Sequence, residues 1–142
     1  MTYNEFLATQ RADWEAAILR ATKTFPPNSA TNYSPTLDLW AAKHPQDGSE
    51  KFSVRVTLPA SASLANAQTI TATIQTSSDG TNFSDTNLIT TLTGAGGIGS
   101  AGQTVVQALP KPYLQYVRSK MVATSGNDPS FDGMVILDLL FA

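Results

Sequence analysis

The sequence has no cysteine, a single histidine and few charged residues, which make up 14% of the chain. Without cysteine, disulfides, thiolate nucleophiles and cysteine-ligated metal sites are excluded. A Ser-His-Asp arrangement would need His44 as its base, but Pro45 follows it in an evident turn, so we expect a solvated loop residue. No Gly-x-Ser-x-Gly elbow presents a serine nucleophile. We therefore expect a protein that is not an enzyme and that binds no cofactor.

Charge is not only scarce but unevenly distributed. The formal net charge of −2 and the pI near 5.1 give no basic surface for nucleic acid. Between Val56 and Pro112 the charged residues are Asp79, Asp85 and Lys111. Serine and threonine replace the missing charges, with 18 threonines and 13 serines in the chain. Such a neutral surface is typical of an area buried against a partner, or of a threonine-rich sheet that faces water.

Long hydrophobic runs are also missing. The most apolar segment, Met134 to Ala142, is about half as long as the roughly 18–20 residues that a membrane span needs. The start of the chain, Met1 to Glu5, is polar and lacks the basic and apolar regions of a signal peptide. We expect a soluble protein that is made in the cytoplasm and that binds no membrane.

The N-terminal segment is predicted to be an amphipathic helix. Thr2 and Glu5 have the spacing of a capping box, and two consecutive prolines end the helix near Thr24. Four large apolar residues recur at helical spacings and form a narrow stripe: Tyr3, Leu7, Trp14 and Ile18. We divide the chain into a helical arm, residues 1–27, and a β domain, residues 28–142. The apolar stripe either packs on its own domain or contacts a neighbouring subunit, and its four residues are the candidate interface.

The β domain is predicted from short alternating segments. Residues 28–35 form a polar linker, and a short first strand follows at Thr36 to Trp40. The longer predicted strands are Lys51 to Leu58, two arms of a hairpin between Gln68 and Leu92, Thr104 to Leu109, Tyr113 to Ala123, and Met134 to Phe141. The hairpin turns at Asp79-Gly80, which tolerates positive φ. The pattern favours a mainly β fold, a single antiparallel β-sandwich or jelly roll of about seven or eight strands with an N-terminal amphipathic helix.

Two loops could be taken for ligand sites. Asp79, Asn82 and Asp85 could offer oxygens to Ca²⁺, but they lack EF-hand spacing and are favoured there by turn geometry alone. The loop Gly94 to Gly102 contains five glycines but has no Gly-Lys-Ser/Thr ending, and a strand follows it instead of a helix. We interpret the turn as structural, without a metal, and the glycine loop as a flexible surface loop.

Aromatic residues are the remaining candidates for binding. Six of them could stack on sugar rings in principle: Trp14, Tyr33, Trp40, Phe83, Tyr113 and Tyr116. Trp14 lies on the helix stripe, and Trp40 follows a pattern that includes Leu37 and Leu39. We expect burial in the core or in an interface for both tryptophans.

From about Ser29 onward, several segments together resemble a known family. A polar lead precedes Thr36-Leu37-Asp38-Leu39, followed by Phe52-Ser53-Val54-Arg55-Val56 and by the run from Thr69 to Phe83. Leu109-Pro110 then leads into Tyr113 to Arg118, and the chain ends after a hydrophobic strand. This pattern resembles the small jelly-roll cement, or decoration, proteins of tailed bacteriophage capsids. The N-terminal helix departs from the compact core of that pattern.

The resemblance implies a structural role in the virion. Proteins of this type form homotrimers on the outer capsid surface and clamp neighbouring capsomers, so the implied partners are the major capsid protein and further copies of the chain. The implied location is the capsid surface, after synthesis in the host cytoplasm. The alternative is a carbohydrate- or receptor-binding β-sandwich of the phage fibre or adhesion type, in which Phe83 or Tyr116 would contact the ligand.

Overall fold

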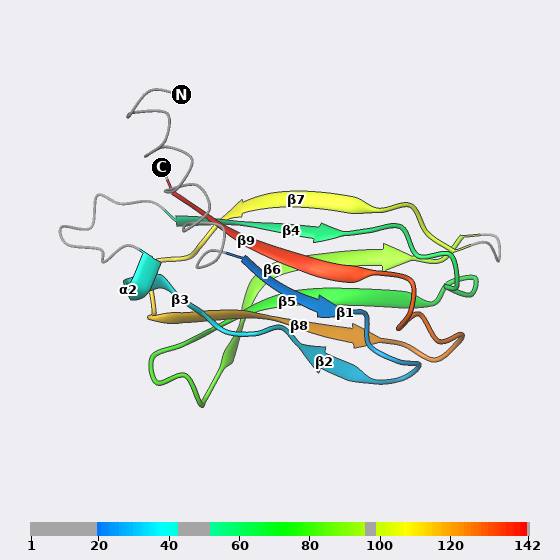
Figure 1. The fold of residues 1–142 in the computed structure, drawn as a ribbon, viewed down its shortest axis with the longest axis horizontal. Helices are drawn as coiled ribbons and strands as arrows, with labels where there is room; N and C mark the ends of the chain where they lie inside the picture. Colours follow the sequence, from blue (N-terminus) through cyan, green and yellow to red (C-terminus); the bar gives the residue numbers. More distant parts are fainter. Residues whose placement is uncertain (1–19, 43–51, 96–98, 142) are drawn as a thin grey trace, which may run out of the picture.

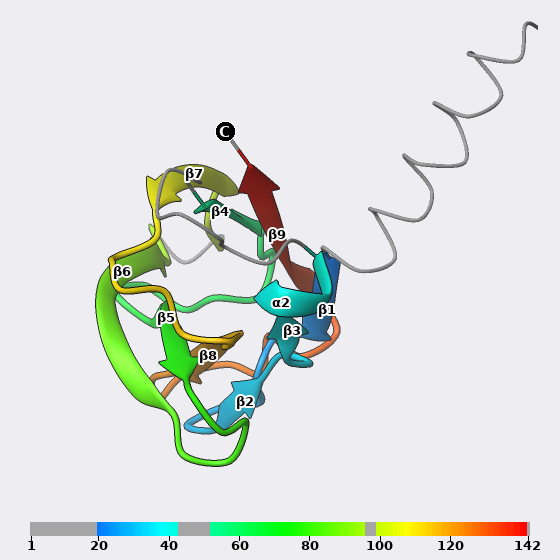
Figure 2. The ribbon, with the colours of Figure 1, turned by 90° about the vertical axis from the view of Figure 1, so that its left-hand side faces the viewer.

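The structure, a computed structural model, describes residues 20–42, 52–95 and 99–141. Its strands form two antiparallel sheets that lie face to face (Figures 1 and 2). Sheet A has the order β1-β9-β4-β7, with bounds Arg20–Thr24, Met134–Phe141, Phe52–Leu58 and Gln103–Ala108. Sheet B has the order β2-β8-β5-β6, with bounds Thr31–Tyr33, Tyr116–Ala123, Thr69–Ser77 and Ser84–Thr93. The predicted mainly β, two-sheet architecture is therefore confirmed.

Alternation along the strands builds the core between the sheets. In β4, Phe52, Val54, Val56 and Leu58 are buried, and the residues between them are partly exposed. Ile74 of β5 and other buried residues of sheet B complete the same apolar cluster. Burial of each such side chain contributes roughly 1.5–3 kcal/mol, so the alternating segments hold the two sheets together.

The predicted helix is wrong for its last residues. Arg20–Thr24 forms strand β1, which pairs with β9 in the register Arg20↔Asp138 to Thr24↔Met134. Ala21 and Phe25 are buried in the core, and this tertiary packing overrides the local helical pattern. Residues 1–19, which include the candidate interface residues of the arm, lie outside the described residues, as does His44, and the arm remains a prediction there.

The segment predicted as a linker, with the short strand after it, also differs from expectation. Thr31–Tyr33 forms β2, which pairs with β8. The expected strand at residues 36–40 contains only the two-residue strand β3, Leu37–Asp38, which also pairs with β8. A short helical turn, α2, Leu39–Ala42, follows. It begins there because the Asp38 carboxylate accepts a hydrogen bond from the Trp40 backbone N–H at 2.9 Å, as an N-cap does.

The described parts of the glycine-rich loop pack closely against the segment from Ser61 to Gln68. The Gly94 N–H donates to the Gln68 carbonyl at 2.8 Å, and the Gly99 N–H donates to the Leu64 carbonyl at 3.1 Å. A Cβ at Gly99 would lie 2.0 Å from the Ser61 carbonyl oxygen. The glycines at these flanks therefore permit a close backbone approach, and the expectation of a flexible loop is wrong for them.

Two glycines with similar backbone angles separate the effect of close packing from that of positive φ. Gly99 has φ +81 and Gly80 has φ +76, but the atoms nearest to a Cβ at Gly80 belong to the Tyr116 ring, at 3.4 Å. Gly80→Ala should cost roughly 1–2 kcal/mol of unfolding free energy for the left-handed backbone. Gly99→Ala should cost about 1–3 kcal/mol more, because the methyl group collides with backbone. Urea unfolding of both variants measures the difference, and equal losses would contradict the packing described here.

Candidate binding surfaces on the two sheets

Chemically distinctive side chains gather on the outer faces of the two sheets. Among residues 20–42, 52–95 and 99–141, no group of three or more His, Cys, Asp or Glu side chains is arranged to hold a metal ion. Within the same ranges, no helix has the length and apolar character needed to cross a membrane. The sheet faces are therefore the candidate sites, and we describe each in turn.

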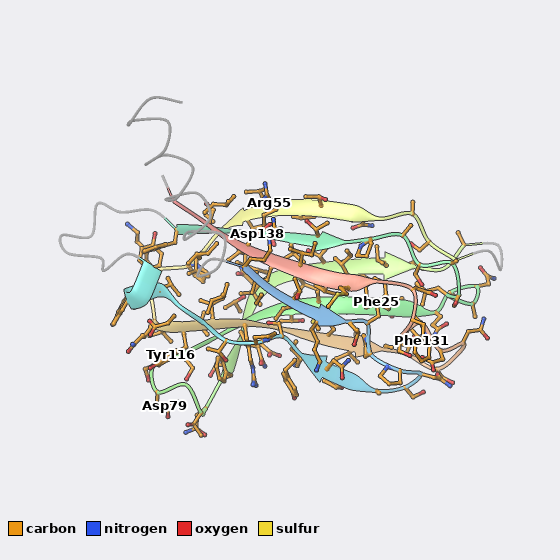
Figure 3. All side chains as sticks on the ribbon, in the orientation of Figure 1. Phe25, Arg55, Asp79, Tyr116, Phe131 and Asp138 are labelled. Carbon is orange, nitrogen blue, oxygen red and sulfur yellow. The ribbon has the colours of Figure 1, made fainter. Side chains whose placement is uncertain are left out.

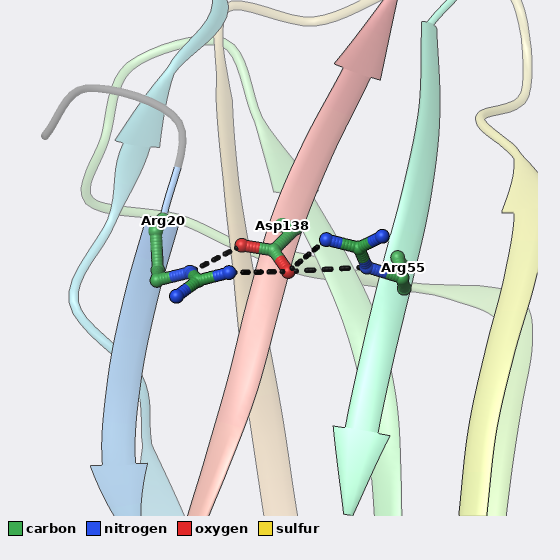
Figure 4. A network of polar contacts seen from close by, with 3 residues as sticks. All are labelled: Arg20, Arg55 and Asp138. Carbon is green, nitrogen blue, oxygen red and sulfur yellow. Dashed lines mark hydrogen bonds and ion pairs between the residues drawn. The ribbon is translucent and has the colours of Figure 1, made fainter. Parts of the chain in front are cut away.

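A row of three charged residues, an aspartate between two arginines, runs across the outer face of sheet A. Asp138 of β9 lies directly opposite Arg20 of β1 and Arg55 of β4 (Figure 4). Arg20 Nε donates to Asp138 Oδ1 at 2.6 Å, and Arg55 Nη2 donates to Oδ2 at 2.9 Å. Burial raises the pKa of the Asp138 carboxyl, but the hydrogen bonds from the two guanidinium groups outweigh burial and hold this pKa below its usual range. The carboxylate is therefore ionised and fully paired, although it is only 7% exposed.

The rest of this face is apolar or carries hydroxyl groups. In β9, Val135, Leu137 and Leu139 point into the core, so the alternate residues Met134, Ile136 and Leu140 face outward with Asp138. Met134 is 45% exposed, and Val106, which pairs with Arg55 from β7, is 57% exposed. Exposed apolar side chains gathered on one face of a sheet can mark a surface that a protein partner covers.

An arginine stacked between two aromatic rings marks the outer face of sheet B. The Arg118 guanidinium carbon lies 4.1 Å from the centroid of the Tyr33 ring and 3.9 Å from that of the Phe83 ring. Tyr33 belongs to β2, Arg118 to β8, and Phe83 to the turn before β6. Each ring face attracts the cation, so the three side chains hold one another in place. We call them the Arg118 stack.

A hydrogen-bonded chain continues from the Arg118 stack across the sheet. Arg118 Nε donates to Gln75 Oε1 at 2.9 Å, and Gln75 Nε2 donates to Asp85 Oδ1 at 2.7 Å. Lys120 Nζ lies 3.0 Å from Asp85 Oδ2. The hydrogen bonds from Gln75 and Lys120 lower the pKa of the Asp85 carboxyl. Gln75 is buried on this outer face, so the chain fixes the position of Arg118.

The Asp79 turn is held together by its own hydrogen bonds. Backbone N–H groups of Asn82 and Thr81 donate to Asp79 Oδ1 at 2.8 Å, and the Ser77 hydroxyl and the Asn82 amide also donate to the carboxylate. The N–H of Asn82, followed by that of Thr81, lowers the pKa of this carboxyl well below its usual range. With donors directed at both oxygens, the turn has the structural role that we predicted from its sequence. Figure 3 places Asp79 at the tip of the β5–β6 hairpin.

The other aromatic residues differ in their surroundings. Trp40 and Tyr113 pack against the core, and the Tyr113 hydroxyl accepts a hydrogen bond from the Phe52 N–H at 3.1 Å. Tyr116 faces outward beside the Asp79 turn, where its ring approaches Gly80 (Figure 3). Of the candidate aromatic residues that the structure describes, it therefore brings Tyr33 and Phe83 together around one cation.

Sequence reasoning missed two features of these surfaces. Nothing in the sequence around Arg118 indicated a binding role, apart from its outward position in an alternating strand. Phe131, in the loop before β9, is 95% exposed and points away from the sandwich at the end opposite the Asp79 turn (Figure 3). Its neighbour Asp132 fixes this loop by accepting hydrogen bonds from the Ser61 hydroxyl and from the Ser63 N–H and hydroxyl. A fully exposed phenylalanine in a fixed loop is a candidate contact for a partner.

No protein-family model matches this chain, and a search of the curated proteins finds no significant match to its sequence. The function is therefore inferred from the strand order and from the chemistry of the two outer faces.

The paired carboxylate on sheet A gives a testable pH dependence. At pH 7, Asp138→Asn should lower the unfolding free energy by about 1–3 kcal/mol. Because the folded pKa lies below the unfolded value of about 3.9, ionised Asp138 stabilises the fold above that pH. This contribution is lost as the pH falls through the folded pKa, so wild type and variant should converge in acid. Urea unfolding at pH 7 and pH 3 measures both effects.

The matched control is Asp128→Asn. Asp128 is exposed and accepts a hydrogen bond from the Ser130 N–H within its own loop, at 2.9 Å. Its replacement should change the unfolding free energy at pH 7 by less than about 0.5 kcal/mol. Equal losses for the two variants would mean that the contacts of Asp138 with the arginines do not stabilise the fold.

Proposed function

We propose that this chain is a structural component of a phage particle, a decoration protein without catalytic activity that binds the outer surface of the capsid. The first support is the strand order. Sheets with the orders β1-β9-β4-β7 and β2-β8-β5-β6 have the connectivity of a jelly roll, in which the first strand pairs with the last. Jelly rolls recur in viral capsid proteins and in lectins, so the choice between these roles depends on surface chemistry.

The observation that carries the proposal is the apolar outer face of sheet A. Met134, Ile136 and Leu140 of β9, with Val106 of β7, give it exposed apolar area, and its central carboxylate is paired with two arginines, so that this row carries one net positive charge. A protein partner can cover the apolar area while both arginines stay paired with Asp138, and one carboxylate of the partner would balance the remaining positive charge. The major capsid protein is the partner that we assign to this face. Repetition over a capsid lattice makes modest contacts effective through multivalency.

A pair of matched variants tests this docking face. Met134 on sheet A and Ile89 on sheet B are apolar and similarly exposed, at 45% and 53%. Met134→Glu should reduce binding to capsids assembled without the protein by at least about tenfold, because the carboxylate would be desolvated in the interface. Ile89→Glu should bind as wild type does. Co-sedimentation with capsids measures binding, and equal binding by both variants would exclude this face.

Self-association is the second element of the proposal. In the described part of the chain β7 pairs only with β4, and its sequence Gln103–Ala108 contains neither charge nor proline. An uncharged edge strand can pair with another copy. The apolar stripe predicted for residues 1–19 can contact a neighbouring subunit, with Tyr3, Leu7, Trp14 and Ile18 as its anchors. We propose that these contacts produce a homotrimer.

Truncation at the start of β1 tests the arm. Light scattering should give the full-length protein about three times the mass of its 15.1 kDa chain. A protein without residues 1–19 should be monomeric, should still unfold cooperatively and should bind capsids more weakly. Removing residues 1–24 also deletes β1 and should lower the unfolding free energy, since Ala21 and the ion pair of Arg20 are lost. An unchanged mass after removal of residues 1–19 would exclude the arm as the trimer contact.

A second candidate function is supported by the other sheet. The Arg118 stack presents aromatic and polar groups together on the outer face of sheet B, a combination suited to a carbohydrate. Sheet A and sheet B face in opposite directions (Figure 2), so a bound capsid protein on one leaves the other accessible.

A further inference from the structure

Arg118 differs from the other arginines that the structure describes. Arg20 and Arg55 share the carboxylate of Asp138. Arg118 has no carboxylate within ion-pair distance in the described part of the chain, and its terminal nitrogens donate no hydrogen bond there, since Nε alone donates, to Gln75. A guanidinium group carries paired N–H donors whose geometry matches a carboxylate. The unused edge of Arg118 is therefore a ready donor pair for an anion.

The position of this donor pair is fixed before any ligand binds. The guanidinium group lies against both the Tyr33 and the Phe83 ring, and buried Gln75 holds its Nε edge. Asp85 in turn holds the Gln75 amide and is itself held by Lys120. Little side-chain freedom is left to lose on binding, and such preorganisation strengthens binding.

The local charge fits an anion with one charge per repeating unit. Arg118 and Lys120 contribute two positive charges and Asp85 one negative charge, so the cluster carries a net charge of +1 (+2 − 1). A polyphosphate backbone needs several cations, and the sequence pI near 5.1 opposes it. A single carboxylate on an otherwise neutral ligand meets the charge and the geometry together.

The surface beside the Arg118 stack is rich in hydroxyl groups. Strand register places six threonines on the outer face of sheet B, of which Thr73 is buried and five reach the surface: Thr31, Thr69, Thr71, Thr91 and Thr93. Thr31, Thr71 and Thr91 lie in the row of Val122 of β8, and Thr69 and Thr93 pair with each other in the next row. Hydroxyl groups both donate and accept hydrogen bonds, as the hydroxyl groups of a sugar do. Tyr33, which is 44% exposed, adds an aromatic surface for the apolar side of a sugar ring.

We propose that the outer face of sheet B binds an acidic polysaccharide, a chain that contains uronic acid units. The carboxylate of one unit accepts hydrogen bonds from the terminal nitrogens of Arg118. The neighbouring sugar units lie along the threonine rows and donate and accept hydrogen bonds there. This inference rests on the second candidate function and names its ligand class. It is independent of capsid docking, because it uses the opposite sheet.

Calorimetric titration of the full-length protein tests the proposal with polygalacturonate, alginate and hyaluronate as probes. At least one of the three should bind, and its affinity should fall as salt concentration rises, because the contact is ionic. Dextran, and the same acidic polymer with its carboxylates methyl-esterified, should bind at least about tenfold more weakly. Failure of all three acidic polymers to bind would overturn the proposal, as would equal binding of the esterified form.

Substitutions then assign the binding to Arg118. Arg118→Gln should weaken binding of the acidic polymer at least about tenfold. Lys23→Gln, which removes one positive charge from an exposed position on β1, should leave affinity within about twofold of wild type. Arg118→Lys keeps the charge but loses the paired donors. The preference for the acidic polymer over its methyl-esterified form should therefore become smaller. If Arg118→Gln binds as wild type does, or if Lys23→Gln weakens binding equally, the assignment is wrong.

These outcomes are separate from those of the docking test. Met134→Glu changes only sheet A and should retain polysaccharide binding, whereas Arg118→Gln should retain capsid binding. Loss of both activities in either variant, with cooperative unfolding preserved, would contradict the separation of the two faces.

Discussion

The pairing of Asp138 with two arginines on flanking strands is the constraint on which sheet A depends. Asp138 lies in the apolar strand β9, and placing a charge there is costly unless the charge is paired. Arg20 and Arg55 come from the first half of the chain, far in sequence from Asp138, and meet it from both sides. A one-residue slip of β9 would turn the carboxylate into the core, and a two-residue slip would move it away from both arginines. The contact therefore fixes register on both sides of β9.

Because this register is fixed, the two faces of the sandwich acquire different chemistry. On sheet A both arginines of the central row are paired with Asp138, and the apolar side chains around this row are suited to a protein partner. On sheet B, Asp85 is shared by Gln75 and Lys120, and Arg118 remains without a carboxylate in the described part of the chain. The difference lies in the arginines: those of sheet A hold a carboxylate, whereas the terminal nitrogens of Arg118 are open to an anion from outside.

Sequence periodicity predicted the strands with clear alternation and missed those that depend on distant partners. β4 was found because its apolar residues recur at every second position, and β9 because apolar residues occupy both of its faces. β1 was assigned to a helix because its five residues come directly after the helical pattern that ends at Ile18. Only pairing with β9 makes them a strand. β2 has three residues, too few for any period to be visible. Both missed strands are stabilised by contacts more than 80 residues away.

The Arg118 stack shows why low charge content matters here. Its three members come from β2, β8 and the turn before β6, so no local pattern could predict their meeting. In a chain rich in charge, an exposed arginine readily finds a carboxylate on a neighbouring strand. Here Asp85, the outward carboxylate of β6 in the same row, binds Gln75 and Lys120 instead. The scarcity of charge that gave no basic surface for nucleic acid thus leaves one guanidinium group of the described residues without a carboxylate, and its contacts with two aromatic rings make that group a binding element.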